Sequence, residues 1–95
     1  MSFQDKIDEL KIELPEARDP VGSYMASKII GKMIFISGQI SISADGELIK
    51  GKVGKELKTE DGYEAAKRCG LSIISQVKKV CDDDLSKIKS CIKLT

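Results

Sequence analysis

A continuous apolar run, Met33 to Ile36, is followed directly by Ser37, Gly38 and Gln39. Consecutive apolar residues without alternation favour a strand that is covered on both faces. Two small residues and an amide at its end predict an opening where this buried strand stops. The sheet that contains the run therefore needs protein on both of its sides.

A second strand is expected just before this run. Tyr24 to Ile30 reads as a strand, and Gly31-Lys32 separates it from the apolar run by two residues. Glycine at the first central position of such a loop favours a type II′ turn, so the two strands should form a hairpin. A loop over 15–22, rich in proline and glycine, would bring Tyr24 to the opening beside Ser37.

Two helices flank this hairpin in the chain. Apolar residues at helical spacing after a possible N-cap at Ser2 predict an additional N-terminal helix over 2–13, which Pro15 would end. Thr59, as an N-cap, begins a longer helix over about 60–81. Its apolar stripe consists of Ala66, Cys69, Ile73, Val77 and Val80. Gly70 costs this helix about 1 kcal/mol relative to alanine, which indicates a strand approaching closely there.

The last segment, 88–95, alternates apolar and polar side chains and is expected to be a strand. The short runs 40–43 and 48–49 are expected to extend or accompany the sheet. The order helix, strand, strand, helix, strand predicts an α+β fold with the long helix covering one face of the sheet. One helix cannot cover both faces of the apolar run, so we expect a homo-oligomer.

Composition limits the classes of function. At 95 residues the chain should form one domain, 1–95, and its net charge is only +1, whereas nucleic-acid binding needs clustered positive charge. Apolar stretches of about five residues are far shorter than the ~20 that cross a bilayer, and the N-terminus does not resemble a signal peptide. We expect no nucleic-acid partner, no membrane and a cytoplasmic location.

Cysteine and histidine usage narrows the chemistry further. Cysteines stand at 69, 81 and 91, without a Cys-x-x-Cys pair, and the chain has no histidine. The absence of histidine excludes catalytic triads that need an imidazole. The cysteine spacing argues against a disulfide framework and against a zinc site. The acidic run 82–84 is interpreted as a solvated cap, and the lysines of 50–58 as a solvated loop. We expect no metal and no cofactor.

Several of these features, in order, resemble the Rid family, the YjgF-like reactive intermediate deaminases that are also called L-PSP endoribonucleases. The resemblance rests on Gly22-x-Tyr24, the hairpin glycine Gly31, Ile36-Ser37-Gly38-Gln39-Ile40, the helix from Asp61, and the strand over 88–95. It implies a chorismate-mutase-like mixed sheet and a homotrimer with ligand clefts between subunits. The matched part, 14–95, corresponds to the N-terminal portion of the family domain, incomplete on its C-terminal side.

The resemblance also implies an activity. Deaminating members hydrolyse enamines or imines such as 2-aminoacrylate to a 2-keto acid and ammonia. Tyr24 would line the cleft, while Ser37 and Gly38 would offer a hydroxyl and a backbone N–H to a small carboxylic metabolite. The family's carboxylate-binding arginine and its late glutamate lie beyond the point that matches Thr95. Neither arginine of this chain, at 18 and 68, matches the family arginine, so no catalytic residue is assigned.

The residues leave other functions open. Without an arginine clamp or a general base, the chain fits a non-catalytic trimeric regulatory protein that binds small carboxylates, and whether it is an enzyme is not decided. RNA cleavage or translation inhibition, which the family's second name suggests, needs a basic groove and an acid–base pair that the residues do not display. In a purely structural interpretation, Tyr24 packs on the core, and Ser37 and Gly38 mark a bend.

Overall fold

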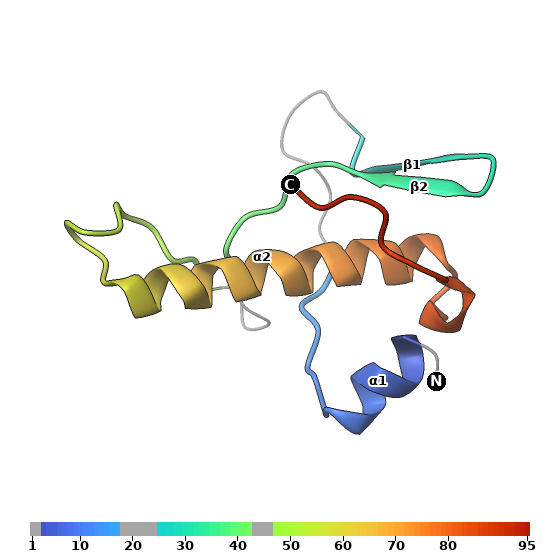
Figure 1. The fold of residues 1–95 in the computed structure, drawn as a ribbon, viewed down its shortest axis with the longest axis horizontal. Helices are drawn as coiled ribbons and strands as arrows, with labels where there is room; N and C mark the ends of the chain where they lie inside the picture. Colours follow the sequence, from blue (N-terminus) through green and yellow to red (C-terminus); the bar gives the residue numbers. More distant parts are fainter. Residues whose placement is uncertain (1–2, 18–24, 43–46) are drawn as a thin grey trace.

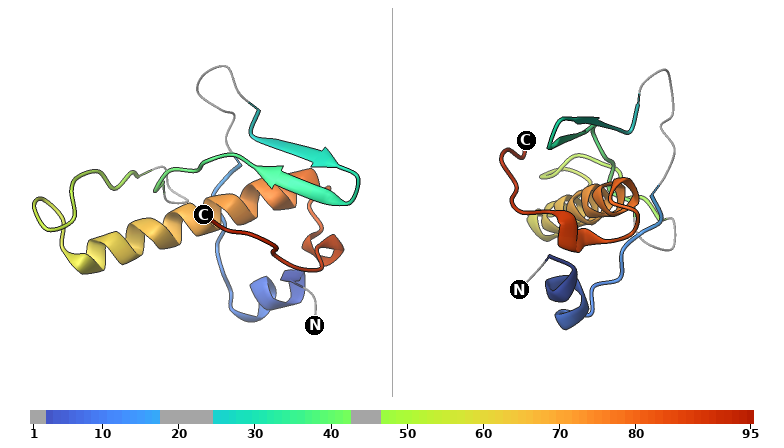
Figure 2. Two further views of the ribbon diagram at one scale, coloured as in Figure 1. Left: turned by 45° about the horizontal axis from the view of Figure 1, so that its top comes forward. Right: turned by 90° about the vertical axis from the view of Figure 1, so that its right-hand side faces the viewer.

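The computed structural model describes residues 3–17, 25–42 and 47–95. Along the chain they form helix α1 (Phe3–Glu9), strands β1 (Ser27–Ile30) and β2 (Met33–Ile36), the long helix α2 (Thr59–Val80) and the 3₁₀ helix η1 (Leu85–Lys87). The hairpin and α1 lie on opposite sides of α2 (Figures 1 and 2). The α+β class is confirmed, with the helix on one face of the sheet.

The predicted hairpin is present. β1 and β2 pair antiparallel, with Ile30 opposite Met33, so two residues form the turn. Gly31 has a φ of 59°, whereas Lys32 is not among the residues with positive φ. Positive φ at the first central position alone is the pattern of a type II′ turn, as predicted. Tyr24, at the predicted start of the first strand, lies outside the described residues.

The single chain covers one face of β2, and the predicted burial of its other face by a second copy stays a prediction. Ile34 and Ile36 are half-buried, but the side chains that alternate with them, Met33 and Phe35, are 45% and 51% exposed. Ile30, which pairs with Met33, is 58% exposed. Successive side chains of a strand point to opposite faces, and α2 covers only one of them. We call Ile30, Met33 and Phe35 the outer face of the hairpin.

Helix α2 begins one residue earlier than its predicted cap suggests. Lys58, rather than Thr59, occupies the N-cap position, and its backbone N–H donates to the Asp61 carboxylate at 2.8 Å. An acidic group three residues after the cap satisfies one of the free amide groups at a helix start. Asp61 therefore fixes this end of the helix, although the sequence favours Thr59 for that role.

The buried side of α2 is more polar than the predicted stripe. Its buried residues are Ser72, Ser75 and Gln76, whereas the apolar stripe is half-buried and its first residue, Ala66, is exposed. A helix of 22 residues is roughly 33 Å long, and strands of four residues, roughly 13 Å long, cover only part of it.

No helix within the described residues combines the length and hydropathy that a bilayer span requires.

The close approach expected at Gly70 is not found. A Cβ added there would meet no atom within 4 Å, whereas one added at Gly62 would lie 3.1 Å from Cγ2 of Val53. The loop over 51–58 folds back on the first turn of α2 and approaches Gly62 there. Its neighbour is a loop side chain and not a strand.

The N-terminal helix is shorter than its predicted range of 2–13. Lys11 has a φ of 52°, and Ile12 donates its N–H to the carbonyl of Ile7 at 3.2 Å. These are the features of a Schellman motif, which ends a helix with one residue in the left-handed region. The helix therefore stops at this motif, and Pro15 lies beyond it.

A small satellite core joins the two ends of the chain. The Leu85 N–H donates to Oε1 of Gln4 at 3.4 Å, and Leu85 and Cys81 are only 3% and 6% exposed. Burial raises the pKa of the Cys81 thiol above its ordinary value. A raised pKa keeps the thiol protonated and unreactive.

The strand predicted over 88–95 is wrong for this chain. These residues form no strand, and Ile92 and Leu94 are 77% and 71% exposed. Figure 1 shows the segment as a coil that runs back from η1. An alternating sequence becomes a strand only when a neighbouring strand accepts its hydrogen bonds. The runs 40–43 and 48–49 contribute a single bridge, between Ile42 and Leu48.

Candidate ligand-binding site

Ser37 extends the hairpin by one residue beyond β2. The carbonyl of Ala26 accepts the Ser37 backbone N–H at 3.0 Å and the Ser37 hydroxyl at 3.1 Å. The register that pairs Ser27 with Ile36 brings these two residues opposite each other. Both donors of Ser37 are therefore directed at the neighbouring strand, and the residue is fixed at the strand end.

The backbone bends away from the sheet immediately after Ser37. Gln39 donates from Nε2 back to the Ser37 carbonyl at 3.1 Å. Gly38, between them, is exposed, and a Cβ added to it would meet nothing within 4 Å. No hydrogen bond of the Gly38 N–H is found within the described part of the chain. Within the described residues, the braced backbone at the end of β2 thus carries one amide donor without a hydrogen-bond partner.

Of the three predicted ligand-binding residues, two can be placed. Ser37 and Gly38 lie next to each other where the sequence predicts an opening, and Tyr24 lies outside the described residues. Ala26 and Gln39, which hold Ser37 in place, were not predicted as site residues. The two-residue turn at Gly31-Lys32 already implies that Ala26 opposes Ser37, so the signal for Ala26 is present in the sequence.

Arg68 does not serve as a carboxylate clamp in this structure. Its Nη1 donates to the carbonyl of Glu47 at 3.0 Å, and its Nε lies 3.5 Å from a carboxylate oxygen of Glu64. The side chain is 17% exposed and ties α2 to the segment that begins at Glu47. The other arginine, Arg18, lies outside the described residues.

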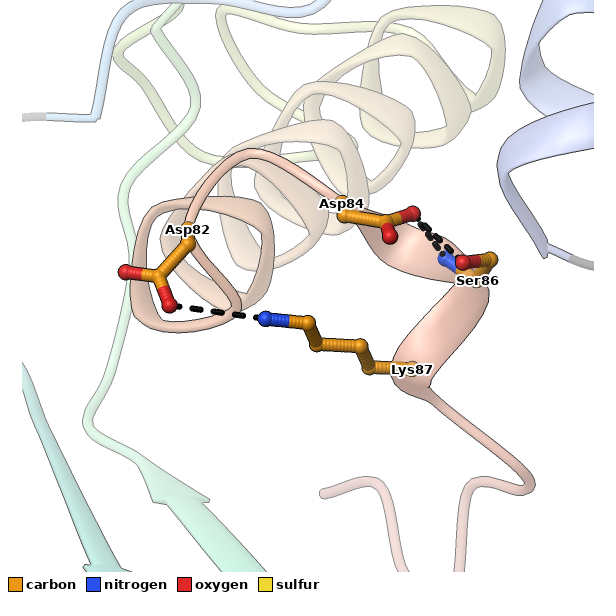
Figure 3. Close-up of polar contacts among 4 residues, drawn as sticks. All are labelled: Asp82, Asp84, Ser86 and Lys87. Carbon is orange, nitrogen blue, oxygen red and sulfur yellow. Dashed lines mark hydrogen bonds and ion pairs between the residues drawn. The ribbon is translucent and has the colours of Figure 1, made fainter.

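The acidic run 82–84 acts as a cap, as predicted. Asp84 accepts the Ser86 N–H at 3.0 Å and the Ser86 hydroxyl at 2.6 Å, and Asp82 pairs with Lys87 at 3.4 Å (Figure 3). The bonds from Ser86 hold the pKa of Asp84 below its ordinary value. Nowhere in residues 3–17, 25–42 and 47–95 do three cysteine or acidic side chains gather as around a metal ion.

The loop before α2 is a solvated basic segment, as expected. The four lysines of this segment are all exposed: Lys50, Lys52, Lys55 and Lys58. The Lys52 N–H donates to the Glu56 carboxylate at 2.8 Å, and this bond holds the pKa of Glu56 below its ordinary value. Glu47, Glu56, Glu60 and Asp61 lie among and beside these lysines, which dilutes the positive charge of the segment.

The family follows from a comparison with known families. A family model described as "YjgF/chorismate mutase-like, putative endoribonuclease" matches residues 5–95, nearly the whole chain. The chain belongs to the YjgF/chorismate mutase-like family. The resemblance stated from Gly22-x-Tyr24 and Ser37-Gly38-Gln39 is thereby confirmed.

Relatives of the YjgF-like chain share its sequence and its fold. Protein TCP17 from Trypanosoma cruzi is 31% identical over 88 residues, which are 93% of this chain and 54% of that protein. A solved structure described as a putative endoribonuclease from Shewanella oneidensis MR-1 is 29% identical with a TM-score of 0.80, over 90% of this chain and 56% of that one. Protein Atu1372 of unknown function from Agrobacterium tumefaciens is 30% identical with a TM-score of 0.72, over 88% and 50%.

The YjgF-like chain covers only part of the length of each of these relatives. The chain spans about half the length of the relatives that it matches, between 50% and 56%. The family model, which matches residues 5–95, includes both the outer face of the hairpin and the coil over 88–95. Activities of whole relatives come to this chain only as proposals.

Proposed function

We propose that the end of β2 forms one wall of a binding site for a small carboxylic metabolite, and that the site serves the hydrolysis of enamines or imines. The observation that carries this proposal is the Gly38 N–H, which has no hydrogen-bond partner within the described residues and lies beside the fixed Ser37. A backbone N–H that is not used within the fold is a good donor for a carboxylate oxygen. Tyr24 is proposed as a further part of the same wall.

The proposed reaction is the hydrolysis of an enamine, which consumes one water molecule and releases one ammonia molecule. A 2-aminoacrylate molecule takes up a proton at its methylene carbon and becomes the imine. Water then adds to the imine carbon, the C–N bond breaks, and the products are a 2-keto acid and ammonia. We assign substrate binding to Ser37 and Gly38 and assign the groups that activate water to parts outside this wall. Because the chain spans about half of its relatives' length, turnover is proposed for a protein with the complete domain, of which 1–95 forms the N-terminal portion.

The proposal includes a homotrimer with the sites between subunits. Its support is the outer face of the hairpin, where Ile30, Met33 and Phe35 are about half exposed, at 58%, 45% and 51%. The register places the exposed Lys28 opposite Phe35 on the same face, and exposed apolar side chains gathered beside it are typical of an interaction surface in soluble proteins. Covering it with another copy would place protein on the second side of the sheet, next to the end of β2.

We also propose a cytoplasmic location. All three cysteines are free thiols: Cys69 is half-buried, Cys81 is buried and Cys91 is exposed. Exposed free thiols persist in compartments that glutathione keeps reduced. A site for reactive intermediates of metabolism fits the same compartment.

Titration of the isotope-labelled chain with 2-oxobutanoate tests the binding half of this proposal. We expect a saturable change in the NMR signal of the Gly38 amide. Gly38→Pro removes the N–H and should abolish binding, whereas Gly38→Ala keeps the N–H in open space and should retain it. Binding that survives in Gly38→Pro, or no saturable change in the parent chain, would contradict the proposal. Binding without release of ammonia from 2-aminoacrylate by a complete-domain protein would identify the non-catalytic regulatory alternative.

RNA cleavage is a second candidate, favoured by the family description and by the four exposed lysines before α2. Incubation with a labelled single-stranded RNA separates it from the first. Cleavage that is lost when Lys50, Lys52, Lys55 and Lys58 are replaced by glutamine, and kept in Gly38→Pro, would support this candidate. Intact RNA with a saturable Gly38 signal would support carboxylate binding.

A further inference from the structure

Helix α1 is held weakly by the rest of the chain. It has seven residues, none of which is buried, and it packs against η1 beside the end of α2 (Figure 2). Phe3 in the helix and Leu10 just after it remain 43% and 55% exposed. An isolated helix shorter than about 12 residues is marginal in water, so α1 depends on its contact with η1 to stay helical.

The Gln4 side chain connects α1 to η1. Its Oε1 accepts the Leu85 N–H at 3.4 Å, and its Nε2 donates to a carboxylate oxygen of Asp8 at 3.2 Å. Asp8 thereby orients the Gln4 amide, with the nitrogen toward its own helix and the oxygen toward η1. The contact between the two helices thus includes a polar bond that separation would break.

The segment that follows α1 is fixed at its far end. Pro15 is buried, and its carbonyl accepts the Ser75 hydroxyl at 2.7 Å. Between the helix and this anchor lies Lys11, with a φ of 52°. A few residues at the end of an element that can absorb a change in φ and ψ are the usual form of a hinge. Residues 11–14 therefore join a weakly held helix to a firmly held proline.

We propose that α1 is a latch that swings open about residues 11–14 while α2 and the hairpin stay folded. Opening breaks the bond between Gln4 and Leu85 and uncovers the satellite core, where Leu85 and Cys81 are 3% and 6% exposed in the closed state. The open state therefore presents a small apolar surface at the C-terminal end of α2. The latch and the hairpin lie on opposite sides of α2 (Figure 1), so this device does not depend on the proposed ligand-binding wall.

Native-state hydrogen exchange of the 95-residue chain tests the latch. The protection factor of the Leu85 amide should be at least about tenfold smaller than that of Gln76 in the interior of α2. Low concentrations of urea should leave the Leu85 value unchanged, because a local opening exposes little surface. Gln4→Ala should speed exchange at Leu85 roughly three- to tenfold, since the closed state loses one hydrogen bond. Lys6→Ala, at an exposed side chain of the same helix, should leave it unchanged.

The thiol of Cys81 reports on opening at a second position. Its reaction with iodoacetamide, followed by peptide mass spectrometry, should be accelerated by the same factor in Gln4→Ala, and the exposed Cys91 gives the rate of a thiol that needs no opening. Faster exchange at Leu85 without faster reaction of Cys81 would overturn the proposal, because only one bond and not the helix would have moved.

Two further results in the parent chain would contradict the latch. If the Leu85 and Gln76 amides have equal protection and the same dependence on urea, α1 opens only when the whole fold does. If the Leu85 amide is unprotected, α1 has no closed state. Both comparisons use the parent chain alone, so they decide the question even if Gln4→Ala does not fold.

Discussion

At the scale of single residues, a few side chains join segments that lie far apart in the chain. Ser75, only 5% exposed, donates to the Pro15 carbonyl at 2.7 Å across 60 positions. Ser37 fixes the end of β2 to Ala26, and Gln4 accepts from Leu85. Each of these bonds pairs a side chain with a backbone group of another segment.

Removing the hydroxyl of Ser75 tests its role as a tether. We expect Ser75→Ala to lower the free energy of unfolding by about 1–2 kcal/mol, because the buried Pro15 carbonyl loses its partner. The exposed Ser90 provides the control, and its alanine variant should lie within about 0.5 kcal/mol of the parent. Denaturation by urea, followed by circular dichroism, measures both. An equal effect of the two substitutions would show that the bond to Pro15 contributes nothing.

At the scale of elements, the helices and the hairpin are set by local sequence, and their ends by specific contacts. α1 stops at a left-handed Lys11, and Asp82 and Asp83, with φ of 56° and 64°, follow the end of α2. Aspartate tolerates this region better than most residues, which makes the acidic run a suitable stop. Gly70 is poorly suited to the interior of α2. It does not lie at a turn, and no atom near it requires a residue without a side chain.

Two glycines of α2 give a matched prediction. Gly70→Ala should raise the free energy of unfolding by about 0.8–1 kcal/mol, because alanine favours a helix and the site is open. Gly62→Ala should gain less, since its Cβ would lie 3.1 Å from Cγ2 of Val53. Thermal and urea unfolding of both variants measure the difference. A loss of stability in Gly70→Ala would mean that another copy of the chain packs against this position.

At the scale of the whole molecule, the chain leaves apolar surface that a single copy does not cover. The outer face of the hairpin and the coil residues Ile92 and Leu94 are all exposed. In the hairpin, apolar side chains on both strands create this face, and α2 occupies only the other one. Burying a phenylalanine contributes about 1.5–3 kcal/mol, so this face contributes substantially to any assembly.

Replacing Phe35 tests whether copies meet at the outer face. Phe35→Lys should weaken self-association at least about tenfold, because the lost burial exceeds the 1.4 kcal/mol that corresponds to one decade. Tyr63→Lys adds the same charge at a side chain of α2 that is 73% exposed and should leave association unchanged. Analytical ultracentrifugation over a concentration series measures both, with the helical circular dichroism signal as a check on folding. Equal association of the two variants would exclude the hairpin as the interface.

The sequence by itself determines the local elements of this protein. The hairpin and its turn follow from Gly31-Lys32, and the long helix follows from its apolar periodicity and its acidic first turn, because both depend on neighbours within a few residues. The motifs around Gly22 and Ser37-Gly38-Gln39 identify the family. Even the pairing of Ala26 with Ser37 is implied by the length of the turn.

Only the tertiary structure decides which surfaces are covered and which polar groups are used. The apolar β2 and the alternating segment 88–95 read as buried strands, yet Phe35 and Leu94 are exposed in the single chain, since burial depends on partners that local sequence does not specify. The buried Ser75, the open Gly70 and the committed hydroxyl of Ser37 likewise depend on distant segments. At the end of β2 the sequence provides Ser37 and Gly38, and the fold directs both donors of Ser37 to the Ala26 carbonyl.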